Sequence, residues 1–175
     1  MLKADLHMHT RYSFDCTTTP EAMVKRCQKS GVNCIAVADH GTIEGGLRVK
    51  EIAPFRVIVA QEVLTPIGEV MGMFLTESIP SNIPVDEAVK RIKAQNGLVC
   101  LPHPFDQMRG ISRQGFADIM RLLPQIDVIE VFNARAMGLG NADGRALAFA
   151  TEHNLLKSAG SDAHRRAEVG LASVL

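Results

Sequence analysis

Strand-like apolar runs alternate with helix-like runs along this 175-residue chain, and this alternation restricts the fold more than any other feature of the sequence. Several of the strand-like runs are continuously apolar, as is typical of strands buried on both faces of a parallel sheet. Strands that alternate with helices indicate βαβ units, so we predict an α/β fold with a parallel sheet. The predicted strands cover residues 3–7, 33–38, 56–60, 70–75, 98–101, 128–132 and 157–159.

The predicted helices begin and end at residues with suitable capping chemistry. Thr19 is expected as the N-cap of the first helix, with Pro20 at its first position and Gly31 at its end. A second helix is predicted over residues 84–96, with acidic residues near its start, basic residues near its end and Gly97 at the C′ position. Further helices are expected near residues 114–123 and 141–153.

Composition and charge argue against several classes of protein. Hydrophobic residues make up 46% of the chain and charged residues 22%, so the chain can form a buried core. The 19 basic residues balance 19 acidic ones, which argues against a broad electrostatic surface for nucleic acid or an anionic membrane. No apolar run approaches the roughly 18 residues that span a bilayer, and the first residues lack the apolar segment of a signal peptide. We therefore expect a cytoplasmic protein without a membrane partner.

The length suits one domain over residues 1–175. Residues 172–175 form an apolar run, so we expect either that the last strand closes the fold abruptly or that a C-terminal piece is missing.

The four cysteines include no C-x-x-C pair and are expected to be reduced thiols.

Five of the six histidines stand at the carboxyl ends of predicted strands, together with acidic residues. In a (β/α) barrel, catalytic side chains converge on that rim. A convergence of imidazoles and carboxylates without thiolates indicates a metal site that suits zinc, manganese or iron but not calcium. The residues are His7, His9, His40, Glu62, His103, Asp162 and His164.

The spacing of His7 and His9 has a direct geometric meaning. Residues i and i+2 of a strand point to the same face, so both imidazoles can reach one ion, with Leu6 and Met8 on the other face. Asp162 and His164 repeat this spacing after the last strand. Each motif alone has a structural explanation, such as a turn cap or a salt bridge. Together, without a metal, they would cost several kcal/mol in desolvation and repulsion.

Four motifs in chain order resemble those of the PHP (polymerase and histidinol phosphatase) domain family, a group of metal-dependent phosphoesterases. They are D-L-H-M-H-T at residues 5–10, A-D-H at 38–40, P-H-P at 102–104 and G-S-D-A-H at 160–164. The resemblance implies a distorted, TIM-like (β/α)7 barrel. That fold agrees with the seven predicted strands and with a length below the ~250 residues of an eight-unit barrel.

The resemblance also implies a set of ligands for two or three divalent ions per chain. His7, His9, Glu62 and Asp162 would hold the first ion; Glu62 and His103 the second; and Asp15, His40 and His164 the third. Family members often carry a further histidine on the strand after the bridging glutamate, where this chain has none. Either Glu69 substitutes for it or the second ion is weakly bound. Glu130 is expected outside the ligand shell or facing the substrate.

The reaction that this site suits is hydrolysis of a phosphate ester of a small metabolite or nucleotide by a metal-activated water. We expect Asp162 to accept the proton of the nucleophile, and His40 or His164 to protonate the leaving oxygen. Among the arginines in predicted rim loops, Arg109 and Arg135 are the preferred phosphate-binding pair.

Two other classes compete with this prediction. Amidohydrolases also begin with H-x-H after the first strand, but they usually carry a lysine at a strand end, whereas Lys50 and Lys90 fall in predicted helices. A nuclease or a polymerase-associated PHP module acting on DNA or RNA is the second alternative. Nucleic acid is the less favoured substrate, because aromatic residues make up 5% of the chain and tryptophan is absent from it.

Overall fold

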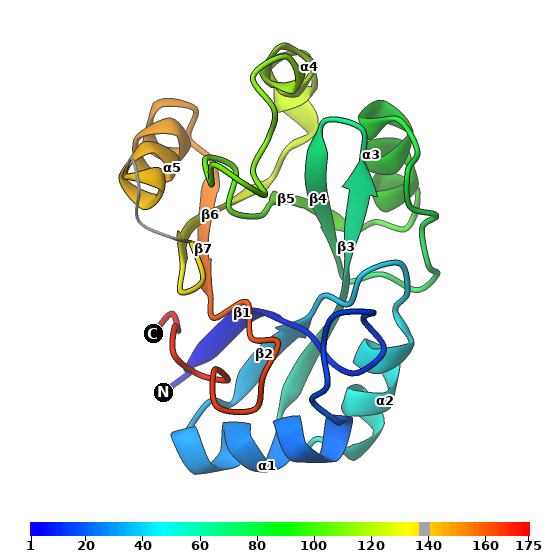
Figure 1. The fold of residues 1–175 in the computed structure, drawn as a ribbon, viewed down its shortest axis with the longest axis vertical. Coiled ribbons are helices and arrows are strands. Elements are labelled where there is room, and N and C mark those ends of the chain that lie inside the picture. Colours follow the sequence, from blue (N-terminus) through cyan, green and yellow to red (C-terminus); the bar gives the residue numbers. More distant parts are fainter. Residues whose placement is uncertain (137–140) are drawn as a thin grey trace.

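A seven-stranded sheet forms the centre of the molecule, and its strands neighbour one another in chain order. The computed structural model describes residues 1–136 and 141–175. Figure 1 shows the strands arranged as a ring with the helices outside it. Met8 pairs with Ala163 beyond the last strand, so the ring is nearly closed. The strands are β1 (Ala4–Met8), β2 (Cys34–Val37), β3 (Arg56–Thr65), β4 (Gly68–Met73), β5 (Leu98–Leu101), β6 (Val128–Asn133) and β7 (Leu156–Gly160).

All seven predicted strands are present, which confirms the distorted seven-stranded α/β barrel, but the sheet is not parallel throughout. β4 runs antiparallel to both β3 and β5. Only residues 66–67 connect β3 to β4, whereas a parallel pair needs a crossover of a dozen or more residues. β3 also continues to Thr65, so Glu62 lies inside a strand and not after its end, which corrects the sequence-based placement.

The first helix, α1 (Pro20–Ser30), has the predicted caps. The Thr19 side chain accepts a hydrogen bond from the Ala22 backbone N–H at 3.2 Å. Gly31 has a φ of 72°, in the left-handed region that glycine adopts without steric cost. The buried face of the helix packs in one apolar cluster with residues of β1 and β2.

The predicted end of α3 (Val85–Ala94) is wrong by one residue. Asn96, and not Gly97, holds the left-handed conformation, with a φ of 57°. The Gly97 N–H then donates to the Ile92 carbonyl at 3.0 Å, and asparagine serves here because its short polar side chain tolerates this conformation. The other helices are α2 (Glu44–Ile52), α4 (Gly115–Leu122), the 3₁₀ helix η1 (Leu123–Gln125) and α5 (Ala142–Glu152). Within residues 1–136 and 141–175, none of the helices has the length and apolar character needed to cross a membrane.

A bulge in β1 changes which of its side chains face the barrel interior. The register between β1 and β2 shifts between Asp5 and Met8. Leu6 packs against the cluster of small and apolar residues inside the ring, while Met8 packs in the cluster under α1. The prediction that Leu6 and Met8 share a face is therefore wrong. His7 and His9 nevertheless approach a common point, as the next section describes.

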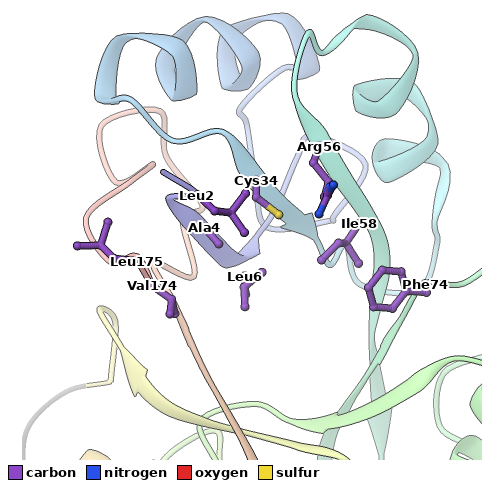
Figure 2. A pocket seen from close by; sticks show the side chains of 9 residues that line it. All are labelled: Leu2, Ala4, Leu6, Cys34, Arg56, Ile58, Phe74, Val174 and Leu175. Atoms are coloured by element: carbon purple, nitrogen blue, oxygen red, sulfur yellow. The ribbon is translucent and has the colours of Figure 1, made fainter.

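An apolar cavity of about 490 Å³ opens at the end of the barrel where β1, β2 and β3 begin. Figure 2 shows Leu6, Ile58 and Phe74 around it. At this end, the backbones of Ala4 and Val174 exchange two hydrogen bonds of 2.8 Å. The residues that the sequence predicts as metal ligands lie at the opposite end of the barrel.

Candidate metal centre

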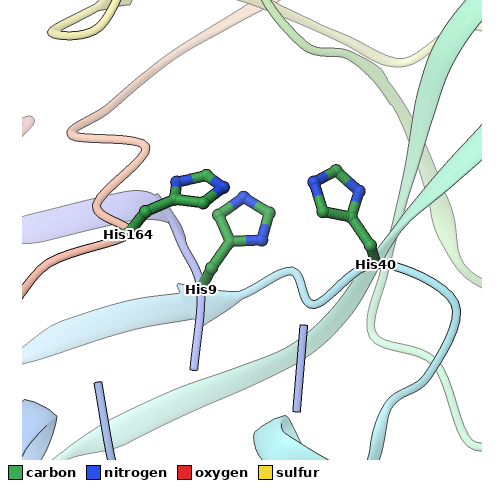
Figure 3. Close-up of side chains that lie close together, drawn as sticks. All are labelled: His9, His40 and His164. Atoms are coloured by element: carbon green, nitrogen blue, oxygen red, sulfur yellow. The ribbon is translucent and has the colours of Figure 1, made fainter. Parts of the chain in front are cut away.

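The carboxyl-terminal end of the barrel gathers the residues that the sequence predicts as metal ligands. They come from β1, β3 and β4 and from the segments that follow β1, β2, β5 and β7. Figure 3 shows three of the imidazoles projecting from separate segments into one space. The groups with ligand atoms within 4.8 Å of one another are His9, His40 and His164; His7, His103 and Asp162; His7, His9 and Glu62; and His40, Glu62 and Glu69.

The first predicted ligand set is compact and buried. The Nε2 atoms of His7 and His9 lie 3.1 Å apart, and Glu62 Oε2 lies 3.2 and 3.3 Å from them. Asp162 Oδ1 lies 3.3 Å from His9 Nε2 and 3.7 Å from His7 Nε2. All four residues are at most 1% exposed. Two nitrogens and two carboxylate oxygens thus face one small space from different strands.

The hydrogen bonding of the Asp162 carboxylate indicates whether this set of residues fits a cation. Its Oδ2 accepts hydrogen bonds from Asn133 Nδ2, at 3.3 Å, and from Arg109. Its buried Oδ1 has no hydrogen-bond partner among the residues that the structure describes. A buried carboxylate oxygen left without a partner is costly, and this one is aimed at the imidazoles of the first set. The donor set and the orphaned oxygen both fit a divalent cation.

Glu69 lies beside the second predicted ligand set. Glu62 Oε1 lies 3.0 Å from His103 Nε2, which places the two oxygens of Glu62 in different sets. Glu69 Oε2 lies 3.6 Å from His103 Nε2, and Glu69 Oε1 lies 3.7 Å from His40 Nδ1. The antiparallel pairing of β3 with β4 brings Glu69 to this position. The carboxylate thus lies where the resemblance predicts a further histidine.

The third predicted set is less deeply buried than the first. His164 Nε2 lies 3.0 Å from Asp15 Oδ2, and His40 Nε2 lies 3.8 Å from the same oxygen. The Asp15 side chain is 36% exposed, whereas the imidazole of His9 behind it is fully buried. A substrate arriving from solvent would therefore meet Asp15, His40 and His164 before it meets the buried set.

Neighbouring polar groups orient the imidazoles. Glu130 Oε1 lies 3.0 Å from His7 Nδ1, and Glu130 Oε2 accepts the His103 backbone N–H at 2.8 Å. Ser13 Oγ lies 3.2 Å from His9 Nδ1. Carboxylates that hold the far nitrogen of a histidine are the usual support of metal-binding imidazoles. Glu130 therefore lies outside the ligand shell, at one of the positions expected for it.

Two residues support the backbone of the site in roles that the sequence did not predict. Cys16, expected only as a reduced thiol, donates from Sγ to the carbonyls of His9, at 3.2 Å, and His164, at 3.1 Å. Asp39 accepts the Thr10 backbone N–H at 2.6 Å and thereby fixes the loop after β1. Both roles depend on contacts between segments far apart in sequence. Asp39 belongs to the A-D-H motif at residues 38–40, but the motif does not show its contact with Thr10.

The approach of β7 to β1 requires glycine at position 160. The Asp162 N–H donates to the His7 carbonyl at 2.7 Å, which draws the two segments together. A Cβ atom on Gly160 would overlap the Cβ of His7 and lie 2.9 Å from Glu130 Oε1. The glycine of the G-S-D-A-H motif is thus a steric requirement of the site.

Protons compensate the buried carboxylates in the absence of a cation. Burial opposes the charged form of His9, but Asp162 and Glu62 outweigh burial and raise its pKa to about 9. Burial, reinforced by Glu62, raises the pKa of Glu69 to about 7. Burial and the neighbouring His9 lower the pKa of His164. A cation that binds here must displace a proton from His9.

Both predicted phosphate-binding arginines reach the cluster. Arg109 hydrogen bonds through Nη1 to Asp162, and its Nη2 lies 3.2 Å from Asp106 Oδ2. Arg135 Nη1 contacts His164 Nδ1 and lies 3.9 Å from Asp162 Oδ1. Their side chains are 31% and 39% exposed, so both guanidinium groups border the solvent side of the centre.

Comparison with known proteins identifies the family to which the sequence is similar. Residues 5–96 match the PHP domain family, and residues 140–175 match the PHP-associated family. An uncharacterized protein of Methanocaldococcus jannaschii is 34% identical over an alignment of 146 positions, and the alignment covers 76% of this chain and 82% of that protein.

Two solved structures share the fold. One is a two-domain protein of Bacteroides vulgatus containing a predicted PHP-like metal-dependent phosphoesterase, with a TM-score of 0.77 and 21% identity. The match covers 95% of this chain and 53% of that protein, so this chain spans about half of its length. The other is an amidohydrolase of Chromobacterium violaceum with bound sulfate and no metal, with a TM-score of 0.78 and 16% identity, over 98% of this chain and 90% of that one.

At these identities the two structures support the fold alone. The match to residues 5–96, in contrast, covers more than half of the 175 residues and contains β2, β3, β4 and all of β1 but its first residue. The matched range includes His7, His9 and His40. The chain belongs to the PHP domain family.

Proposed function

We propose that this protein hydrolyses phosphate monoesters of small molecules with the help of divalent cations. The observation that carries the proposal is the joint placement, at one end of the barrel, of the imidazole and carboxylate cluster and of two arginines on its solvent side. Cations favour carboxylate and imidazole donors, and guanidinium groups favour phosphate oxygens.

The residues that would hold the cations are those of the three sets described above. His7, His9, Glu62 and Asp162 form the buried set; His103 and Glu69 extend it through Glu62; and Asp15, His40 and His164 form the outer set. Zinc, manganese or iron suits these donors. When bound, such ions lower the pKa of water toward neutrality and neutralise phosphoryl oxygens.

The remaining chemistry belongs to the side chains. A water oxygen forms the new bond to phosphorus, the bond from phosphorus to the leaving oxygen breaks, and inorganic phosphate and an alcohol result. Asp162 is the proposed acceptor of the water proton. The proposed donor to the leaving oxygen is His40 or His164, whichever of the two does not hold a cation. Arg109 and Arg135 would hold the phosphoryl group, and a small phosphorylated metabolite of the cytoplasm is the proposed substrate.

A reconstitution assay tests this proposal. Metal-depleted protein, supplied with Mn²⁺, should hydrolyse 4-nitrophenyl phosphate, and metal analysis should find more than one ion per chain. Wild-type turnover in a His7→Ala/His9→Ala double variant would show that the cluster is not catalytic. Greater activity on a single-stranded oligonucleotide than on a nucleoside monophosphate would favour the nuclease alternative. Greater activity on an amide or a lactone than on a phosphate ester would favour the amidohydrolase alternative.

A further inference from the structure

A pocket adjoins the metal centre on the side of the turn between β3 and β4. It has a volume of about 360 Å³ and lies between residues 64–69 and residues 108–112. Glu69 and Arg109 line it, and both also contact the cluster, Glu69 through His103 and Arg109 through Asp162. A molecule whose phosphate lies against Arg109 can therefore extend its remaining part into this pocket.

The walls beyond these two charged groups offer apolar surface. Leu64 is 43% exposed and Met108 is 91% exposed, while Ile67 between them is partly buried. Large apolar side chains exposed beside a site of chemistry are typical of surfaces that contact a ligand.

The polar side chains of the pocket are already engaged. Thr65 Oγ1 donates to the Gly68 carbonyl at 2.6 Å within the turn. Ser112 Oγ accepts the Gly115 backbone N–H at 3.0 Å. A group rich in hydroxyls would give up hydrogen bonds to water on entering this pocket and find few replacements, whereas an apolar group would lose none.

We propose that this pocket binds the leaving group of the substrate and selects a compact apolar one, such as a single ring or a short branched alkyl group. The proposal rests on the phosphoesterase function proposed above. The volume of about 360 Å³ lies at the low end of ligand pockets, which span roughly 300–1,000 Å³, and therefore suits a compact leaving group.

The test compares benzyl phosphate with glycerol 2-phosphate on Mn²⁺-loaded protein. Both esters release an alkoxide, so contacts in the pocket and not the acidity of the leaving group should separate them. We expect kcat/KM to be about 10-fold higher for benzyl phosphate, as for other apolar pockets. A Leu64→Ala/Met108→Ala double variant should lose most of this preference. Leu147→Ala, on α5 and 48% exposed, is the matched control and should keep the preference.

A binding measurement separates failure of this proposal from failure of the phosphoesterase function. Benzylphosphonate and methylphosphonate are not hydrolysed, and calorimetry gives their affinities directly. Tighter binding of benzylphosphonate that is lost in the double variant supports the pocket even if neither ester is hydrolysed. Equal affinities, or a preference that survives in the double variant, overturn the proposal. Loss of the preference only in Phe14→Ala, whose 87% exposed ring lies beside His40, would also overturn it.

Discussion

Raising the pH should destabilise the metal-free protein between pH 6.5 and 8.5. In the folded chain, burial opposes protonation of His9, but Asp162 and Glu62 outweigh it and raise its pKa from 6.5 to about 9. The folded state therefore keeps a proton that the unfolded state releases. The stabilisation is fully present below pH 6.5 and is lost as the pH rises through about 9.

The size of the effect follows from the two pKa values. A shift from 6.5 to about 9 corresponds at most to about 3 kcal/mol, and about 2 kcal/mol of this is lost by pH 8.5. At His7 and His103, burial is likewise outweighed by carboxylates, which raise their pKa values and add to the decline. Glu69 acts in the same direction at lower pH, since burial raises its pKa from 4.5 to about 7.

Urea denaturation of EDTA-treated protein at pH 6.5, 7.5 and 8.5 measures this decline in the free energy of unfolding. Excess Mn²⁺ should abolish most of the decline, because the cation takes the place of the proton. His9→Gln should reduce the decline, whereas His153→Gln, beyond the end of α5, should leave it unchanged. A metal-free protein whose stability stays level or rises over this range would refute the electrostatic description of the cluster.

Three further predictions concern single residues. Thr19→Ala removes the cap of α1 and should lower the free energy of unfolding by about 1 kcal/mol in urea, with unchanged Mn²⁺ affinity; an equal stability would show that the cap is not needed. Gly160→Ala forces His7 away and should weaken Mn²⁺ binding about 10-fold or more in calorimetry, whereas unchanged affinity would mean that the strands shift freely. Glu69→Ala should leave about one Mn²⁺ fewer per chain in metal analysis, and an unchanged count would exclude it as a ligand.

Features set by nearby residues were predictable from the sequence. The caps of α1 depend on Thr19 and Gly31, which act within one helical turn, and the structure confirms both. The direction of β4 was not predictable in this way, because an apolar run has the same periodicity in parallel and antiparallel pairs. The direction of β4 follows from the shortness of the connection, residues 66–67, between β3 and β4. That length is known only once β3 is known to extend to Thr65.

Some features of the candidate site were likewise predictable from the sequence, and others were not. The types of its residues and their places near strand ends were predictable, because the carboxyl ends of the strands meet at one rim. The pairing of Arg109 with Asp162 was not, since it joins a loop to a strand end 53 residues later in the chain. The position of Glu69 beside His103 depends on the antiparallel hairpin, and so it could not be assigned before the hairpin was known.

The contacts that close the barrel also assemble its buried ligands. The Asp162 N–H donates to the His7 carbonyl at 2.7 Å, and the His9 N–H donates to the Ala163 carbonyl at 3.0 Å. Cys16 then ties the backbone after β1 to the backbone after β7. The ring therefore cannot open between β1 and β7 without separating His7 and His9 from Asp162. Because a cation held by these side chains would resist that separation, metal binding and closure of the barrel are coupled in one equilibrium.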